Sequence, residues 1–533
     1  MKNLIVRLIL VLVVIPSVSK AAESQPIDHF VFLVHGLGGN VESFGSMQEA
    51  LTKHLNETPS MGNVAVASFG YLTFREYGKS EEFAELFGDF IMKTVNGLSP
   101  ERYVAHPNYK ISVVAHSQGG LVTTTLFYRS LQNRPYYDPE IARRMTNVIT
   151  LGTPFWGSKV ATYAVQNPWK FDKFQGLAND FLADVGKVGS LQIKELALGS
   201  SVVQRYRRNM MEMGPDAVNS IYDRVRVLNV AGNANLKRIT QENTTLLKPK
   251  SKAKQVLSNY FSGKIDTVFG LTEYEADMLV SIPSATLNTM TVQKLNTDYE
   301  MGESTMPWEF NTFDKADRLL VRTVHASPKA EDVYDIVYTP KPCIEDENCD
   351  HDTYNYVLNY LRGYSLQDIK NLRAGSQDGA SLGFDNVIGD DKVKMQNFGG
   401  FTLGVNVRLP VGKENMRRSV RITVTPARTS EANAPELLVS LKDETLSKVR
   451  YDKSSTYPDS MIEWRTGHFK YTEDESIDTP NRRNGGLVRI QICASGMRTR
   501  VVYAPVKPTL STFVDVQLAE MTPEEARQLL LRH

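Results

Sequence analysis

The residue most suited to chemistry is a serine placed where a strand should give way to a helix. Ser117 follows the apolar run 111–115 and stands just before a helix that we expect to begin near Gly119. A nucleophile on such a sharp turn needs small residues two positions before and after it, because bulk there would collide with neighbouring backbone. Ala115 and Gly119 meet this requirement, so the spacing predicts a nucleophilic serine.

A glycine-rich string, His-Gly-Leu-Gly-Gly at 35–39, ends an earlier apolar run at 30–34. Nucleophilic attack on an acyl group develops a negative oxygen, which needs backbone N–H donors aimed at it. Glycines allow the chain to approach the substrate closely. We therefore expect the N–H groups of Leu37 and Gln118 to form an oxyanion hole.

A third string, Leu-Gly-Thr-Pro-Phe-Trp-Gly-Ser at 151–158, ends another apolar run. Together the three strings resemble the α/β-hydrolase superfamily, especially bacterial secreted triacylglycerol lipases and esterases. The resemblance covers roughly residues 30–363. It implies hydrolysis of lipid or other carboxylic esters through a Ser-His-Asp triad and an acyl-enzyme, without a cofactor. An acyltransferase or amidase using the same triad, and a non-catalytic surface-binding protein, are the alternatives.

The order of the triad in this superfamily, Ser then Asp or Glu then His, excludes the five histidines that precede Ser117. His468 in the β-rich tail and His533 at the last position are set aside as well, which leaves two of the nine histidines as candidates for the base. His325 follows the strand-like run 319–324. His351 lies between a candidate disulfide, Cys343 with Cys349, and a helix expected at 354–361. In the lipases that the chain resembles, the catalytic histidine commonly lies in a loop entering the last helix. A loop held at both ends can fix an imidazole. The prediction is His351, with His325 as the alternative.

The acid must come from a loop before the base. The string 277–285 is similar to the lipase pattern Asp-Gly-x-Val followed by Ser-Ala, with Met278 in place of the usual glycine. This resemblance assigns the acid to Asp277, with Asp266 and Glu275 as alternatives.

The elements that must position these residues change character along the chain. Near-continuous apolar runs at 30–34, 64–67, 111–115, 148–151 and 225–230, separated by amphipathic stretches, predict a mostly parallel sheet covered by helices on both faces. Beyond about residue 395, short alternating runs predict an all-β, sandwich-like domain. The predicted organisation is a catalytic domain at 26–363, a linker at 364–394 and an accessory domain at 395–533. A cap at 159–198 is either a mobile lid or a fixed cover.

The N-terminus predicts export. Lys2 and Arg7 precede a short apolar run that ends in small residues, the pattern of a signal peptide over residues 1–21. Disulfides form in exported proteins, and Cys343 and Cys349 bracket five residues, so we expect a bridge there. We expect a periplasmic, outer-surface or secreted protein with no transmembrane segment in the mature chain.

Charge excludes another class of function. The chain has 61 Lys and Arg against 60 Asp and Glu among 533 residues, which argues against binding nucleic acid through a basic surface. No His or Cys pair has metal-ligand spacing, so no metal site is predicted. Relatives often carry a structural calcium near the histidine, to which Asp350 or Asp352 could contribute, but their spacing is not specific. The expected partner is an ester substrate, in one interpretation at a lipid–water interface.

Overall fold

The computed structural model describes most of the predicted catalytic domain at 26–363, called the hydrolase-like part after its resemblance, and much of the predicted accessory domain at 395–533, called the β-rich part. The described residues are 25–73, 78–158, 161–162, 165, 190–200, 202–203, 221–232, 277, 279–294, 310–313, 315–321, 323, 325, 335–373, 382–383, 400–426, 438–441, 460–470, 486–506 and 510–531. The predicted signal peptide and most of the predicted cap lie outside these ranges.

The central sheet has seven strands in the order β2-β1-β3-β4-β5-β8-β9. Its first six strands are parallel, and β9 pairs antiparallel with β8. The carboxyl ends of the parallel strands therefore meet at one edge, where functional residues of open α/β sheets gather. The strands are β1 (Ile27–Val34), β2 (Val64–Phe69), β3 (Ala105–His116), β4 (Met145–Leu151), β5 (Arg226–Gly232), β8 (Asp317–Val321) and β9 (Leu382–Gly383).

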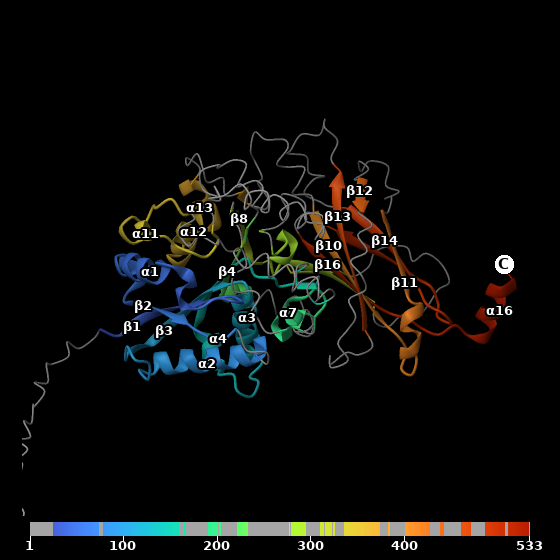
Figure 1. Ribbon diagram of the computed structural model, residues 1–533, viewed down its shortest axis with the longest axis horizontal. Coiled ribbons are helices and arrows are strands. Elements are labelled where there is room, and N and C mark those ends of the chain that lie inside the picture. Colours follow the sequence, from blue (N-terminus) through green and yellow to red (C-terminus); the bar gives the residue numbers. More distant parts are fainter. Residues whose placement is uncertain are drawn as a thin grey trace, which may run out of the picture.

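Helices cover both faces of this sheet, as the apolar runs predict (Figure 1). Alternate residues of β1 enter separate cores: Phe30 and Phe32 pack with α2 and α3, whereas Val31 and Leu33 pack with α1 and α12. A strand buried on both sides needs apolar residues at every position. The helices are α1 (Met47–Asn56), α2 (Ser80–Val95), α3 (Gln118–Leu131), α4 (Pro139–Arg144), α7 (Ser190–Leu196), α11 (Pro342–Glu345), α12 (Asp352–Leu361) and α13 (Leu366–Arg373), with short 3-10 turns η1 (Val41–Phe44) and η2 (Pro59–Met61).

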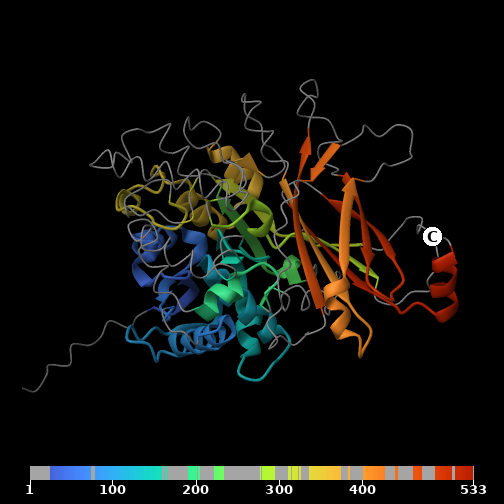
Figure 2. The same cartoon turned by 45° about the vertical axis from the view of Figure 1, so that its right-hand side comes forward.

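Two further sheets make up the β-rich part (Figure 2). A six-stranded sheet runs β12-β13-β10-β16-β6-β7 and a three-stranded antiparallel sheet runs β11-β14-β15, with an apolar cluster between them. The six-stranded sheet is mixed, because β16 pairs parallel with both β10 and β6. The elements are η4 (Ile282–Ser284), β6 (Thr289–Lys294), β7 (Phe310–Phe313), β10 (Gly400–Arg408), η5 (Glu414–Ser419), β11 (Arg421–Pro426), β12 (Leu438–Leu441), β13 (Ser460–Lys470), β14 (Gly486–Cys493), β15 (Arg500–Val506), β16 (Ser511–Gln517) and α16 (Pro523–Leu531).

Strand pairing joins the two parts of the chain directly. β6 and β7 come from the hydrolase-like part, yet they complete the six-stranded sheet beside β16. Ser511 Oγ donates to the carbonyl of Pro283, and the Trp156 and Phe513 rings lie 4.9 Å apart between centroids. Within the predicted linker, α13 and β9 are regular elements, and β9 pairs with β8. The β-rich part is thus attached through β6 and through the residues just before it.

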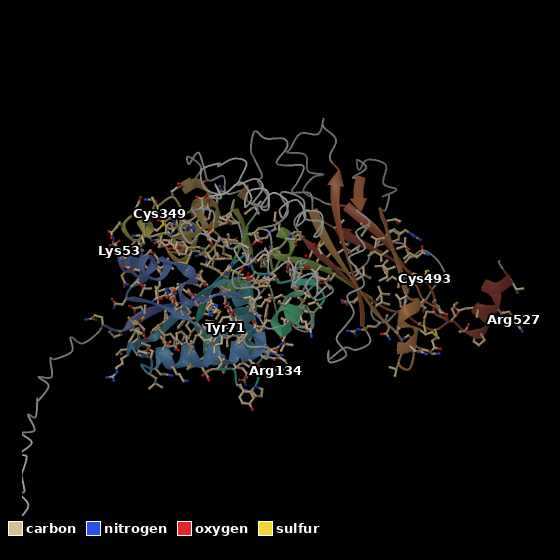
Figure 3. All side chains as sticks on the ribbon, in the orientation of Figure 1. Lys53, Tyr71, Arg134, Cys349, Cys493 and Arg527 are labelled. Carbon is tan, nitrogen blue, oxygen red and sulfur yellow. A yellow bond between two sulfur atoms is a disulfide. The ribbon has the colours of Figure 1, made fainter. Side chains whose placement is uncertain are left out.

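A disulfide joins Cys343 and Cys349, at the pairing that the sequence predicts. Cys493 is a free, partly buried thiol on β14, far from this bridge (Figure 3). Among the helices that the structure describes, none is both long and apolar enough to cross a membrane.

Candidate active site

Ser117 stands on a strained turn between β3 and α3. Its φ of 51° and ψ of −124° lie in a region that residues other than glycine rarely adopt. Such strain persists only where the surroundings enforce it, and it clusters at functional sites. A Cβ at Gly36 would lie 2.6 Å from Ser117 Cβ, and one at Gly119 would lie 2.4 Å from the Val34 carbonyl. The glycines around the turn are therefore required by close packing.

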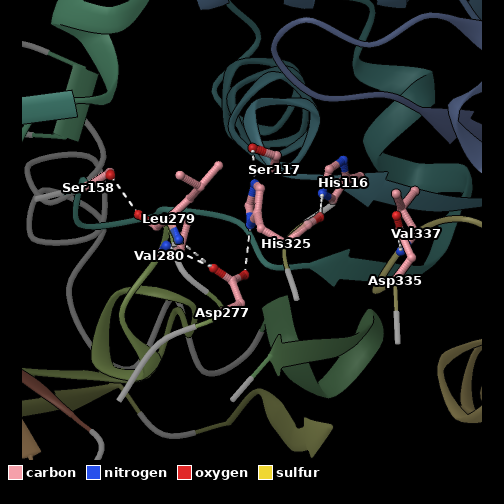
Figure 4. A network of polar contacts seen from close by, with 9 residues as sticks. All are labelled: His116, Ser117, Ser158, Asp277, Leu279, Val280, His325, Asp335 and Val337. Atoms are coloured by element: carbon pink, nitrogen blue, oxygen red, sulfur yellow. Dashed lines mark hydrogen bonds and ion pairs between the residues drawn. The ribbon is translucent and has the colours of Figure 1, made fainter. Parts of the chain in front are cut away.

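Ser117, His325 and Asp277 form a continuous hydrogen-bonded chain (Figure 4). His325 Nε2 lies 2.8 Å from Ser117 Oγ, and His325 Nδ1 lies 2.7 Å from Asp277 Oδ2. A carboxylate only accepts hydrogen bonds, so Nδ1 carries the proton and Nε2 presents its lone pair to the serine. All three side chains are buried, at 6%, 5% and 0% exposure in that order. This is the arrangement of a nucleophile, a base and an orienting acid.

The acid is held by its own loop. Asp277 Oδ1 accepts from the N–H groups of Leu279 and Val280 at 3.1 and 2.9 Å. The backbone carbonyl of Asp277 accepts from the His325 N–H at 2.9 Å. These contacts leave Oδ2 directed at His325 and fix acid and base relative to each other. Of the alternative acids, Asp266 and Glu275 lie outside the described residues.

Two glycines at strand ends make room for the acid and the base. Gly152, after β4, has a φ of +57°, and a Cβ there would lie 2.8 Å from Asp277 Oδ2 and 3.0 Å from His325 Nδ1. Gly232 ends β5, where a Cβ would lie 2.6 Å from Asp277 Cβ. Both positions exclude any side chain.

The prediction of His351 as the partner of Ser117 is wrong in this geometry. His351 is the N-cap residue of α12: its Nδ1 accepts from the Tyr354 N–H at 3.1 Å, and its Nε2 donates to the Asp335 carbonyl at 3.0 Å. Its imidazole therefore serves the helix start rather than the serine. His325 follows β8, a parallel strand whose carboxyl end lies at the same edge as that of β3. In the sequence, the strand before His325 indicates the partner of Ser117, and the disulfide-bridged loop before His351 does not.

The glycine-rich turn after β1 is rigidly braced. Tyr71 N–H donates to His35 Nε2 at 3.2 Å, so the proton of His35 is on Nδ1, which donates to the Gly36 carbonyl at 2.8 Å. Gly39 N–H donates to the same carbonyl. Because the peptide bond is planar and trans, fixing the Gly36 carbonyl also fixes the direction of the Leu37 N–H. Among the described residues, nothing accepts a hydrogen bond from that N–H.

Gln118 is the first residue of α3, so its N–H has no partner within the helix. It adjoins Ser117, and the close approach of Gly36 to Ser117 brings the braced turn to the same place. The two predicted oxyanion donors thus flank the serine from different elements.

A second histidine beside the base is kept neutral. His116 Nε2 donates to the His325 carbonyl at 3.0 Å, and the two rings lie 4.8 Å apart. Burial, followed by the neighbouring His325, holds the pKa of His116 well below its ordinary value. The site therefore carries no second imidazolium next to His325.

The loop 153–158 holds the segment around Asp277 in place, a role that its sequence did not indicate. Ser158 Oγ donates to the Leu279 carbonyl at 2.6 Å, and Trp156 Nε1 donates to the Thr286 carbonyl at 2.7 Å. Ser284 Oγ donates to the Gly157 carbonyl at 2.6 Å. The string at 152–158 thus packs against the Ser-Ala pair at 284–285, and both lie beside the loop of Asp277. Within the described ranges, no cluster of three or more His, Cys, Asp or Glu residues could hold a metal ion.

Comparison with known proteins agrees with this architecture. The family described as "Putative serine esterase (DUF676)" matches residues 24–180, which include the glycine-rich turn, Ser117 and the loop 153–158. No curated protein matches the chain in sequence.

A solved structure shares the fold over most of the chain. Phospholipase PlaB from Legionella pneumophila superimposes with a TM-score of 0.54 at 11% identity, covering 92% of this chain and 94% of that one. Lipase BlEst2 from Bacillus licheniformis in its mature form has 18% identity, a TM-score of 0.31, and coverage of 49% and 80%. The chain has the α/β-hydrolase fold with an additional β-rich part, and the predicted resemblance to lipases and esterases is confirmed.

Proposed function

We propose that the protein is an exported serine hydrolase that cleaves carboxylic ester bonds of lipids, with Ser117 as nucleophile, His325 as base and Asp277 as the orienting acid. The observation that carries the proposal is the chain of two short hydrogen bonds through His325, at 2.8 and 2.7 Å. The family match and the fold support the coarser statement, an ester hydrolase.

In the first half of the reaction, Ser117 Oγ attacks the ester carbonyl carbon while its proton passes to His325 Nε2. The resulting imidazolium donates through Nδ1 to Asp277, whose charge stabilises it. Collapse of the tetrahedral intermediate breaks the bond to the alcohol, which takes the proton from Nε2. Water then attacks the acyl-enzyme with the same histidine as base, and the carboxylic acid leaves.

The N–H groups of Leu37 and Gln118 receive the oxyanion in both halves. The support for this is the orientation of the Leu37 peptide by His35 and Gly39, and the position of Gln118 at the start of α3. Donors held in place before the reaction need no reorganisation, and removing one typically costs about 3 kcal/mol of barrier.

Two observations support the lipid substrate and export. The fold is shared over nearly the whole chain with a protein named as a phospholipase, including the part beyond the hydrolase. A disulfide, here between Cys343 and Cys349, persists in oxidising compartments, in agreement with the signal-peptide pattern at residues 1–21.

The test combines labelling with turnover. A fluorophosphonate should label the wild-type protein once, at Ser117, and Ser117→Ala should abolish both labelling and release of fatty acid from phospholipid vesicles while circular dichroism stays unchanged. Turnover retained by Ser117→Ala would disprove the assignment. Products formed with an added alcohol would reveal acyl transfer in place of hydrolysis.

A further inference from the structure

A buried carboxylate links a short helix outside the central sheet to the start of α2. Glu195 lies on α7 and is 7% exposed. Its Oε2 accepts from both the N–H and the hydroxyl of Ser80, at 2.8 and 2.9 Å. Ser80 is the first residue of α2, a helix of 16 residues, so the negative charge lies where unsatisfied N–H groups and the helix dipole favour it.

The contact continues to the residue after the nucleophile. Gln118 Nε2 donates to Ser80 Oγ at 3.5 Å, the longest of these bonds, and the Gln118 side chain is fully buried. Because Ser80 Oγ gives its proton to Glu195, its lone pairs face Gln118. Glu195 thereby fixes Ser80 Oγ, which accepts the hydrogen bond from the Gln118 side chain. The backbone N–H of the same Gln118 is one of the two proposed oxyanion donors.

The other end of the same segment holds the acid loop. Ser158 N–H donates to the Leu196 carbonyl at 2.7 Å, and Ser158 Oγ donates to the Leu279 carbonyl. Leu279 N–H in turn binds Asp277 Oδ1. A Cβ at Gly157 would lie 2.7 Å from Leu198 Cα, so the two segments touch along their backbones. One seven-residue helix and the turn after it thus reach toward both the oxyanion donor and the acid.

We propose that Glu195 is a positioning residue: it anchors α7 on α2 and so holds Gln118 and the loop of Asp277 in their working geometry. This inference rests on the proposed function. It assigns to a residue outside the triad a share of transition-state stabilisation, since a displacement of about 1 Å at an active site can cost 10²-fold in rate.

The experiment compares variants of the full chain on a soluble p-nitrophenyl ester. Active sites are counted with a fluorophosphonate, and a short alkylboronic acid serves as a mimic of the tetrahedral intermediate. Glu195→Ala should lower kcat per active site by about 10²-fold, leave KM within about twofold, and raise the boronic acid Kd by a similar factor to the loss of kcat. Glu195→Gln should retain kcat within about tenfold, because its amide oxygen can still accept from Ser80.

The matched control is Glu82→Ala, at the same helix start. Glu82 is exposed, and its carboxylate caps the Lys79 N–H without reaching the site. Its kcat and boronic acid Kd should equal those of the wild type.

If Glu195 has a purely structural role, Glu195→Ala will lower the melting temperature and the number of labelled sites but leave kcat per site and the boronic acid Kd unchanged. That result overturns the proposal. If Glu195→Ala yields no folded protein, Ser80→Ala decides, because it keeps the N–H bond and loses only the hydroxyl: a kcat lowered about tenfold supports the proposal and an unchanged one overturns it. A wild type that neither labels nor hydrolyses refutes the proposed function itself, and this inference with it.

Discussion

Replacing Gly152 by alanine separates the geometry of the site from the stability of the fold. Gly152 has a φ of +57°, and an added Cβ would lie 2.8 Å from Asp277 Oδ2 and 3.0 Å from His325 Nδ1. Real Cβ atoms almost never approach so closely, so the acid or the base must move by several tenths of an ångström. Gly496 is the matched control, with a φ of +70° and nothing within 4 Å of its added Cβ.

Alanine in the left-handed region should cost both variants about 1–2 kcal/mol of unfolding free energy, and the overlap with Asp277 and His325 should cost Gly152→Ala about 1–3 kcal/mol more. Only Gly152→Ala should also disrupt the 2.7 Å bond between His325 and Asp277. Loss of that alignment should lower kcat by about 10²-fold, because it weakens the orientation and charge stabilisation of the imidazolium. The measurement is kcat per fluorophosphonate-labelled site, beside urea denaturation of each variant. Wild-type kcat in Gly152→Ala would refute the steric reasoning.

Three further predictions concern the surroundings of the site. Phe513→Ala should lower the unfolding free energy by about 3–5 kcal/mol, because the buried ring packs on Trp156; a loss below about 1 kcal/mol in urea denaturation would show that β16 contributes little to the hydrolase. The double variant Cys343→Ala with Cys349→Ala should lose about 2 kcal/mol with an unchanged kcat, since the bridge supports no catalytic group; a lost kcat per labelled site would argue otherwise. Burial lowers the pKa of His29 to about 4, so between pH 6.5 and 4 the unfolded chain binds a proton that the folded chain does not. The unfolding free energy therefore decreases as the pH drops across this window. Between pH 7 and 4, the unfolding free energy of His29→Leu should therefore fall by about 3 kcal/mol less than that of the wild type, and equal decreases would contradict this.

Local constraints made the sharp turn at Ser117 predictable. Ser117 needs Ala115 and Gly119 beside it whatever the rest of the chain does, so the sequence pattern alone locates the elbow. The parallel sheet is equally evident from its doubly buried strands. The Asp277 side chain could be assigned only through its resemblance to a lipase pattern, and the structure places that side chain against His325.

The base and the β-rich part depend on distant contacts, which local patterns do not show. His351 combines a neighbouring disulfide with a helix start, but an imidazole at an N-cap is already used by the helix. His325 has no motif of its own, and only the position of β8 in the sheet brings it to Ser117. The parallel pairing of β6 with β16 joins residues more than two hundred positions apart, and strand patterns do not reveal which strands pair.

If His325, and not His351, is the base that activates Ser117, replacing the two histidines must affect turnover very differently. The most direct measurement is kcat per active site for His325→Ala and His351→Ala on a soluble ester, with folding checked by circular dichroism. His325→Ala should lose at least about 10⁴-fold in kcat. His351→Ala should lose about 1 kcal/mol of unfolding free energy and little turnover. Turnover retained by His325→Ala, or abolished in folded His351→Ala, would contradict the assignment of His325 as the base.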